Sequence, residues 1–180
     1  MTGAWEPMLE QLAQERGARL RAFAVMLAGQ SAADDLVQEA IIATFSRRRG
    51  FATIGQAEQY VRRAIATRYL DAVRREQSTR SRERRNAPPT VAPDHADAVA
   101  ADDALGTVLA QLPPRQRACV ALRYLDDLSV RETAHALGLS EGAVKRYVSD
   151  ALATLNARLG THERLDDVET TGIRATKGGA

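Results

Sequence analysis

The sequence predicts an all-α protein made of two small helical domains joined by a flexible linker, with a helix-turn-helix in the C-terminal domain. Apolar residues recur at helical spacing through most of the chain. Only 4% of the 180 residues are aromatic, whereas alanine and arginine, both strong helix formers, are abundant. The stretch 86–98 carries three prolines among small and acidic residues and cannot bury a core. We therefore expect helices on either side of a linker, and no strands.

The segment 128–159 carries the strongest local signals. Ser129 and Glu132 have the spacing of a capping box, which predicts the start of a helix. Gly138 can supply the left-handed residue that ends this helix, and Ser140 can cap a second one. The outward side of the second helix consists of small, polar and cationic residues, namely Gly142, Lys145, Arg146, Ser149 and Ala153. Such a surface favours binding in a DNA groove, with a helical hairpin that has a solvated cationic side as the alternative.

Two further helices are predicted at the N-terminal end of the chain. Apolar spacing over 9–27 indicates a helix, or a pair of helices, that Gly29 ends. A second helix is expected to begin at Ser31, with Asp34 at capping-box spacing. Acidic and amide side chains stay on its outer side, namely Asp34, Asp35, Gln38 and Glu39. These residues either complement the helix dipole or dock on a basic helix of a partner.

A long helix is predicted from Gln56 to about Arg85. Its buried side is expected to include Val61, Ala64, Ile65, Ala72 and part of Tyr69. The opposite side places an aromatic ring among cations, with Tyr60, Arg63, Thr67 and Arg74 in one stripe, and further arginines follow at Arg75, Arg80, Arg82, Arg84 and Arg85. A basic track with a ring is typical of surfaces that hold single-stranded nucleic acid, although a solvated helix end has the same composition. Leu70 interrupts this stripe, and the sequence offers no reason for it.

The C-terminal domain is predicted to begin with a helix over 105–112, which Pro113 and Pro114 end while they start the next one. The expected core residues of that next helix are Cys119, Val120, Leu122 and Leu125. Asp126 and Asp127 then turn the chain into the helix-turn-helix. The resulting boundaries are 1–85 and 102–160 for the two domains, 86–101 for the linker and 161–180 for a mobile tail.

Composition excludes several classes of protein. One cysteine and three well-separated histidines leave no disulfide framework and none of the usual zinc spacings. No apolar run approaches the roughly 20 residues that span a bilayer, and 1–10 lacks the features of a signal peptide. We therefore expect a cytoplasmic protein without membrane insertion. The net charge of +2 means that any DNA affinity must come from the placement of the charges.

With these residues in place, the chain resembles the extracytoplasmic function (ECF) sigma factors, the smallest group of the sigma-70 family of bacterial transcription initiation factors. The likeness covers about residues 9–159, in three segments that follow one another in the family's order. ADDLVQEAIIATF at 33–45 is similar to region 2.2, and YVRRAIATRYLDAVRR at 60–75 is similar to regions 2.3 and 2.4. The stretch that begins LPPRQRACVALRYLDDLS at Leu112 is similar to region 4.

The resemblance implies a sigma factor that directs core RNA polymerase to specific promoters and helps to open the minus-ten element. Binding to the clamp helices of the polymerase β′ subunit is implied for Asp34, Asp35, Gln38 and Glu39. Minus-ten binding is implied for Tyr60, Arg63, Thr67, Arg74 and Arg75. Minus-thirty-five binding is implied for Arg131, Ser140, Lys145, Arg146 and Ser149. The implied partners are the polymerase core, including its β flap, promoter DNA and an anti-sigma factor. No cofactor, metal or catalytic residue is implied, and the chain is not expected to be an enzyme.

Two residues depart from the family pattern, and two other functions stay open. Thr67 stands where many members carry Asn, which changes the expected minus-ten base preference. Asp150 stands where Arg is common, which weakens expected contacts with phosphate. One alternative is a free-standing helix-turn-helix regulator whose N-terminal helices dimerise or sense a signal. The other is an enzyme with Asp34, Asp35 and Glu39 as metal ligands, although no second acidic cluster faces them in the sequence.

Overall fold

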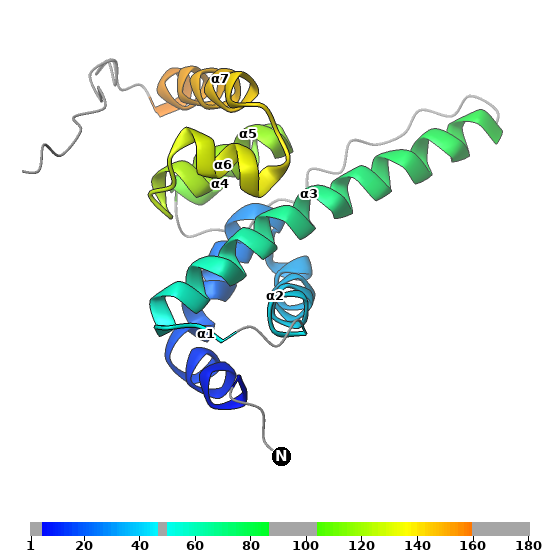
Figure 1. Ribbon diagram of the computed structural model, residues 1–180. Coiled ribbons are helices and arrows are strands. Elements are labelled where there is room, and N and C mark those ends of the chain that lie inside the picture. The colour runs from blue at the N-terminus through cyan, green and yellow to red at the C-terminus, as the bar shows by residue number, and fades with distance from the viewer. Residues whose placement is uncertain (1–4, 47–49, 87–103, 160–180) are drawn as a thin grey trace, which may run out of the picture.

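The structure is a computed structural model that describes residues 5–46, 50–86 and 104–159. These ranges contain seven helices and no strand, which confirms the all-α class (Figure 1). The helices are α1 (Glu6–Ala28), α2 (Gln30–Phe45), α3 (Ile54–Asn86), α4 (Ala104–Ala110), α5 (Pro114–Tyr124), α6 (Val130–Leu137) and α7 (Glu141–Leu159). None of these helices is long and apolar enough to cross a membrane. The predicted linker, apart from residue 86, and the predicted tail lie outside the described residues.

The first three helices pack on one another. Their apolar sides form a core whose fully buried members include Leu12, Leu20, Leu27, Val61 and Ile65. The helix α3 begins at Ile54, two residues before the predicted start, and its C-terminal turns extend beyond the rest of the molecule (Figure 1). Ala72 was predicted to be buried and is exposed, because it lines a hollow between α2 and α3 that neighbouring side chains leave open. Ala64 is only half-buried.

Helix ends follow the predicted signals at four places. Gly29, with φ 83°, separates α1 from α2, and Gly138, with φ 62°, ends α6 in the left-handed conformation. Ser129 and Glu132 form the predicted capping box, in which the Ser129 hydroxyl accepts a hydrogen bond from the Glu132 amide. The Ser140 hydroxyl accepts one from the Ala143 amide at 3.1 Å. The helix-turn-helix is therefore built by residues that the sequence already identifies.

The capping box predicted at Ser31 and Asp34 is wrong. The helix α2 begins at Gln30, directly after Gly29, so Ser31 is already inside the first turn and no side chain caps the helix. The Asp34 carboxylate instead accepts a hydrogen bond from Arg21 Nε of α1 at 2.8 Å. The glycine that ends α1 leaves no room for an additional capping residue before α2.

Removing the Ser129 hydroxyl is expected to lower the free energy of unfolding. Ser129→Ala loses the cap on α6, at a cost of about 1 kcal/mol. Hydrogen bonds from the Ser129 amide and hydroxyl hold the pKa of Glu132 below its ordinary value of 4.5. A lowered carboxyl pKa contributes stability above 4.5 that is lost as the pH falls through the lowered value. Urea unfolding at neutral and at acid pH should therefore show a larger effect at neutral pH, whereas Ser78→Ala on the exposed side of α3 should show none at either.

The C-terminal half has a small core of its own, formed by Leu109, Leu112, Val120, Ala151 and Leu155. Leu125 was predicted to belong to the core, and this is wrong, because its side chain is 46% exposed. The helix α5 ends at Tyr124, so the helical periodicity that placed Leu125 on the side of the buried Leu122 no longer applies. Asp126 and Asp127 form the predicted turn, and Asp127 takes a positive φ of 51°.

The two halves of the chain contact each other directly. The core of the first three helices continues into buried residues of the C-terminal half, namely Ala118, Cys119, Ala121, Leu122, Leu128, Ala134, Leu137 and Val144. In Figure 1 the helices α4, α5 and α6 lie between α7 and the first three helices. Leu70, which the sequence left unexplained, is 7% exposed and lies beside Pro113 and Tyr147 of the C-terminal half. The sequence analysis had placed the two halves independently of each other.

Cys119 is buried as predicted, and burial raises the pKa of its thiol from 9.0 to about 11. Because the thiolate is the reactive form, this shift lowers the reactive fraction at pH 8 by about 100-fold. Iodoacetamide should therefore alkylate the native protein at least about 100 times more slowly than the urea-unfolded protein. Mass spectrometry of timed samples measures both rates, and equal rates would show that the thiol is accessible in the native state.

Candidate nucleic-acid interface

The first candidate surface is the exposed side of α7. Lys145, Arg146 and Ser149 are exposed there, while Val144 and Ala151 on the other side are fully buried. The turn at Gly138 and the cap at Ser140 set the start of this helix. We call Lys145, Arg146 and Ser149 the α7 surface. Its cations and hydroxyl are donors that suit phosphate oxygens and base edges.

Tyr147 holds one end of the α7 surface in place. The Arg146 guanidinium lies 5.3 Å from the centre of the Tyr147 ring, and Arg115 Nη1 of α5 donates a hydrogen bond to the Tyr147 hydroxyl at 3.3 Å. This hydrogen bond from Arg115 lowers the pKa of Tyr147. Asp150, the departure from the family pattern, is exposed beside Ser149. A carboxylate at that position opposes the approach of a phosphate.

The second candidate surface lies on α3 and consists of Tyr60, Arg63 and Thr67, which we call the α3 stripe. Tyr60 is 36% exposed, and the Arg63 guanidinium lies 5.7 Å from the centre of its ring. The sequence analysis missed Phe51, whose half-buried ring packs against Tyr60 at 5.4 Å between ring centres. The feature of the sequence that could have identified Phe51 is its position just before α3, in a chain with few aromatic residues. The supported ring of Tyr60 can stack on an unpaired base, and Arg63 can contact the backbone of a single strand.

The α3 stripe borders a cavity of about 610 Å³ between α3 and α6. The lining residues are Tyr60, Arg63, Arg131, Glu132, His135 and Ala136. Arg131 was predicted to bind the minus-thirty-five element with Lys145, yet it lies in this cavity with Tyr60 and Arg63. The Thr67 hydroxyl lies 2.9 Å from the Arg63 carbonyl oxygen and 3.1 Å from the Ala136 carbonyl oxygen of α6, so its single proton can be donated to either.

Arg74 and Arg75 were predicted to act with the α3 stripe, and the structure places them elsewhere. Arg74 Nη1 donates a hydrogen bond to the Asp71 carboxylate at 3.3 Å, on the exposed part of α3. Arg75 lines a different hollow, of about 260 Å³, together with Asp35 and Glu39 of α2. Any contact of these two arginines with nucleic acid therefore belongs to the part of α3 beyond the stripe.

The third candidate surface is acidic and lies on α2. The structure brings the four predicted side chains together on the exposed face of this helix, and we call Asp34, Asp35, Gln38 and Glu39 the acidic patch. The sequence analysis missed Ile42, which is 60% exposed and lies one turn after Glu39 on the same face. An apolar side chain next to carboxylates suits the side of a basic amphipathic helix. The feature of the sequence that could have identified Ile42 is its spacing of three residues from Glu39, which places both on one face of the helix.

Metal chemistry gains no support from the geometry. Within residues 5–46, 50–86 and 104–159, no three His, Cys, Asp or Glu side chains gather as metal ligands would. The carboxylates of Asp35 and Glu39 face a hollow lined mostly by apolar and cationic side chains. The alternative of a metal-dependent enzyme therefore lacks a second set of ligands.

An all-α fold with a helix-turn-helix is typical of DNA-binding proteins, and comparisons with known proteins agree with this class. The family described as "Sigma-70, region 4" matches residues 102–155, which contain α4 to α6 and most of α7. The RNA polymerase sigma-E factor of Streptomyces antibioticus is 34% identical over 140 residues, which cover 73% of this chain and 72% of that protein. The ECF RNA polymerase sigma factor SigE of Mycolicibacterium smegmatis is 29% identical over 171 residues, 87% of this chain and 63% of that protein.

A solved structure supports the fold. The sigma factor RpoE of Bartonella quintana, crystallised in complex with the anti-sigma factor NepR, aligns with a TM-score of 0.61 at 20% identity, covering 85% of this chain and 97% of that one. The chain belongs to the ECF sigma factors of the sigma-70 family.

Proposed function

We propose that this ECF sigma factor directs core RNA polymerase to promoters through its three separate surfaces. The acidic patch binds the β′ clamp helices, the α3 stripe holds the non-template strand of the minus-ten element, and the α7 surface reads the minus-thirty-five duplex. The single observation that carries the proposal is that three surfaces of different chemistry, two of them exposed and the α3 stripe partly exposed, lie on three different helices of one chain. Each surface suits a different partner.

The acidic patch suits a protein partner because nucleic acid would be repelled. Asp35 and Glu39 are exposed, and within the described part of the chain only Asp34 of the patch has an intramolecular ion pair, with Arg21. The carboxylates can accept hydrogen bonds from arginine or lysine side chains of a helix, and Ile42 adds an apolar contact at the same site. This combination supports docking on a basic helical partner such as the β′ clamp helices.

The α3 stripe suits a single strand better than a duplex. A base can stack on the ring of Tyr60 only after it has left its own stack, at a cost of a few kcal/mol. Arg63 can contact the adjacent backbone, and Thr67 offers one hydroxyl to a base edge. Because Thr67 lacks the two-pronged amide of the Asn that many members carry, we propose a different minus-ten base preference. No step here needs a catalytic residue, since the polymerase performs the chemistry.

The remaining partners follow from membership of the family. We propose that the C-terminal half also contacts the β flap, that an anti-sigma factor binds the chain, and that the protein works in the cytoplasm. Ser140 and Arg131 join the set that approaches the minus-thirty-five element, Ser140 from the start of α7 and Arg131 from α6. We propose that the two halves of the chain, predicted at 1–85 and 102–160, reach separate promoter elements.

In vitro transcription tests the proposed function and yields the promoter at the same time. Purified protein and core polymerase are incubated with a library of genomic fragments, and the transcripts are sequenced at their 5′ ends. We expect specific start sites that share two upstream elements and that disappear when the protein is omitted. If the library gave no start site that depends on the protein, while a primary sigma factor gave many, the proposal would be wrong. A footprint of the protein alone on palindromic DNA would instead favour the free-standing regulator.

A further inference from the structure

The cavity between α3 and α6 differs in size and chemistry from two other hollows of the structure. Its volume is about 610 Å³, against about 260 Å³ for the hollow beside Asp35 and Glu39 and about 210 Å³ for one beside Pro113 and Pro114. Sites for small molecules measure about 300–1,000 Å³, so of these three only the first has room for an organic ligand of ordinary size. Apart from Ala136, its lining consists of charged and polar side chains, which disfavours a mainly apolar ligand.

The cavity carries cationic groups on both of its walls. Arg63 lies on the α3 wall, and Arg131 and His135 lie about one turn apart on the α6 wall. Within the described part of the chain, neither arginine has an ion pair. The buried Nε of Arg63 also lacks a hydrogen-bond partner among the described residues. A buried donor without a partner calls for a water molecule, an ion or a ligand.

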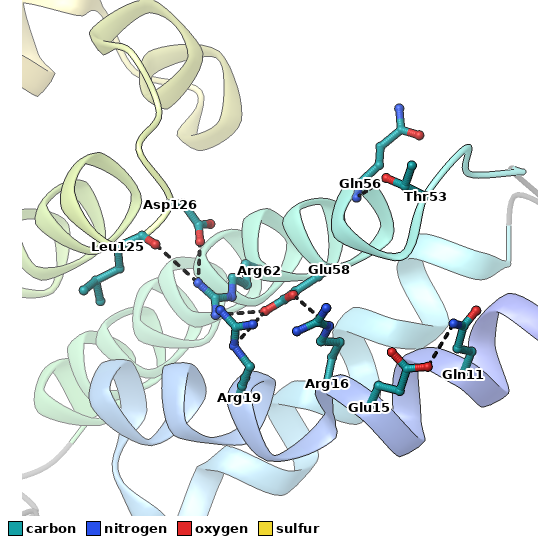
Figure 2. A network of polar contacts seen from close by, with 10 residues as sticks. All are labelled: Gln11, Glu15, Arg16, Arg19, Thr53, Gln56, Glu58, Arg62, Leu125 and Asp126. Atoms are coloured by element: carbon teal, nitrogen blue, oxygen red, sulfur yellow. Dashed lines mark hydrogen bonds and ion pairs between the residues drawn. The ribbon is translucent and has the colours of Figure 1, made fainter.

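The acidic side chains near these arginines are already engaged by other groups. Glu132 lines the cavity, but its Oε2 accepts hydrogen bonds from the Ser129 amide at 2.9 Å and from the Ser129 hydroxyl at 2.7 Å. Asp126, which lies within electrostatic reach of Arg63, accepts a hydrogen bond from Arg62 Nη1 at 2.7 Å (Figure 2). Two arginines against one engaged carboxylate leave the lining with a net positive charge. This charge suits an anionic ligand.

The α3 wall also offers an aromatic surface. The Tyr60 ring is 36% exposed, and it rests against the Phe51 ring at 5.4 Å between ring centres. Nucleobases stack on aromatic rings, and this stacking contributes to binding whatever the base is. A planar base therefore has a place on α3, next to cations that suit an attached phosphate group. An acidic peptide would make no comparable use of the ring.

The two walls are held together by contacts that a ligand need not make. The Thr67 hydroxyl of α3 lies 3.1 Å from the Ala136 carbonyl oxygen of α6. Arg62 of α3 donates to Asp126 of the C-terminal half and, from Nη2, to Glu58 of its own helix at 3.0 Å (Figure 2). The side chains of Arg62 and Asp126 are only 13% and 2% exposed. The cavity is therefore formed before a ligand arrives, which lowers the entropic cost of binding.

We propose that this cavity binds a nucleoside diphosphate, with the base against Tyr60, the first phosphate group at Arg63 and the second at Arg131 and His135. A diphosphate suits the cavity better than a monophosphate because cations stand on both walls, and a single phosphate group meets only one of them. The site shares Tyr60 and Arg63 with the α3 stripe, but it depends on the cavity and not on the promoter. The site and the proposed function can therefore fail separately.

Isothermal titration calorimetry of the full chain with ADP, GDP, AMP and inorganic pyrophosphate tests the site. ADP and GDP should each bind with a dissociation constant below about 1 mM. AMP lacks the second phosphate group and pyrophosphate lacks the base, so each should bind at least about tenfold more weakly than ADP. Absence of saturable binding by both diphosphates would overturn the proposal. AMP or pyrophosphate that bound as tightly as ADP would overturn the nucleoside diphosphate as the class of ligand.

Variants on the two walls locate the ligand. Arg63→Gln on α3 and Arg131→Gln on α6 should each weaken ADP binding by about tenfold or more, because each removes a charge-assisted hydrogen bond to phosphate. Tyr60→Leu should weaken the binding of ADP and leave that of pyrophosphate unchanged. Arg82→Gln is the matched control, since it removes an exposed arginine of α3 outside the cavity and should bind ADP as the parent does. Equal losses in Arg82→Gln and Arg131→Gln, or losses in the α3 variants alone, would overturn the site.

Thermal unfolding gives a second readout. Because a ligand that binds only the folded chain raises its unfolding midpoint, ADP should raise the midpoint of the parent and of Arg82→Gln more than that of Arg131→Gln. Arg131 and Arg82 are both exposed, so the three midpoints without nucleotide should agree and show that each protein is folded. Transcription with core polymerase is measured separately. Nucleotide binding by a chain that supports no promoter-dependent transcript would leave the site standing and overturn the proposed function, whereas transcription without nucleotide binding would do the reverse.

Discussion

Replacing Asp35 and Glu39 together with alanine is expected to abolish binding to core polymerase at concentrations where the parent protein binds fully. Both side chains are exposed in the free chain and line the same hollow beside Arg75. Once a partner covers them, each carboxylate becomes a buried, hydrogen-bonded charge. Removing one partner of such a pair costs about 2–5 kcal/mol, so the double change should cost about 4 kcal/mol or more. This corresponds to roughly a thousandfold weaker affinity.

Fluorescence anisotropy of labelled protein titrated with core polymerase measures this loss. The matched control is Glu10→Ala combined with Glu15→Ala, which removes two exposed carboxylates from α1 and leaves α2 unchanged. The control should bind nearly as well as the parent, and both double variants should keep the parent's unfolding midpoint. Equal weakening by the two double variants would mean that net charge, and not the acidic patch, governs the interaction.

Alanine at Lys145 or Arg146 is expected to weaken recognition of the minus-thirty-five element while polymerase binding is retained. A side chain that contacts a base edge contributes about 1–3 kcal/mol of discrimination, or about 5- to 150-fold in affinity. Removing a side chain that contacts only phosphate weakens binding to all sequences alike, and it lowers the slope of binding against salt concentration by about one. Arg146, held against Tyr147, is the better placed of the two for a fixed contact.

Holoenzyme binding to promoter fragments measures both effects. The fragments carry either the natural upstream element or a scrambled one, and the salt concentration is varied. Arg158→Ala, near the end of α7, serves as the control because it removes one cation from the same helix. The three variants Lys145→Ala, Arg146→Ala and Arg158→Ala could all weaken binding to the two fragments to the same extent. In that case the α7 surface would contribute electrostatic attraction to DNA of any sequence and would not recognise the upstream element.

The local features of the fold could be predicted because their causes lie within a few residues. The capping box of Ser129 and Glu132 needs a spacing of three, and Gly138 ends α6 through its own φ. Helical periodicity likewise identified α3 and most of its buried side. The same rules failed where a neighbouring signal took precedence: Gly29 started α2 before Ser31 could cap it, and the end of α5 exposed Leu125.

The packing of the two halves could not be predicted because its causes lie far apart in the chain. Arg62 and Asp126 are separated by 64 positions, and neither belongs to a periodic pattern that connects them. The one trace in the sequence was Leu70, an apolar residue in a polar stripe. The site residues were identified as a set by resemblance, but the sequence could not show that Arg131 lies beside Tyr60 or that Arg75 lies beside Asp35.

Cys119 is the only cysteine of this chain, and it is buried in the core with a proton that is hard to remove. Sensors of oxidative stress use accessible, acidic sulfhydryls as the reacting groups. Cys119 in its buried position therefore lacks the properties of such a group. If the genes that this chain serves respond to oxidants, we expect the reacting cysteines to lie elsewhere and this chain to transmit the outcome.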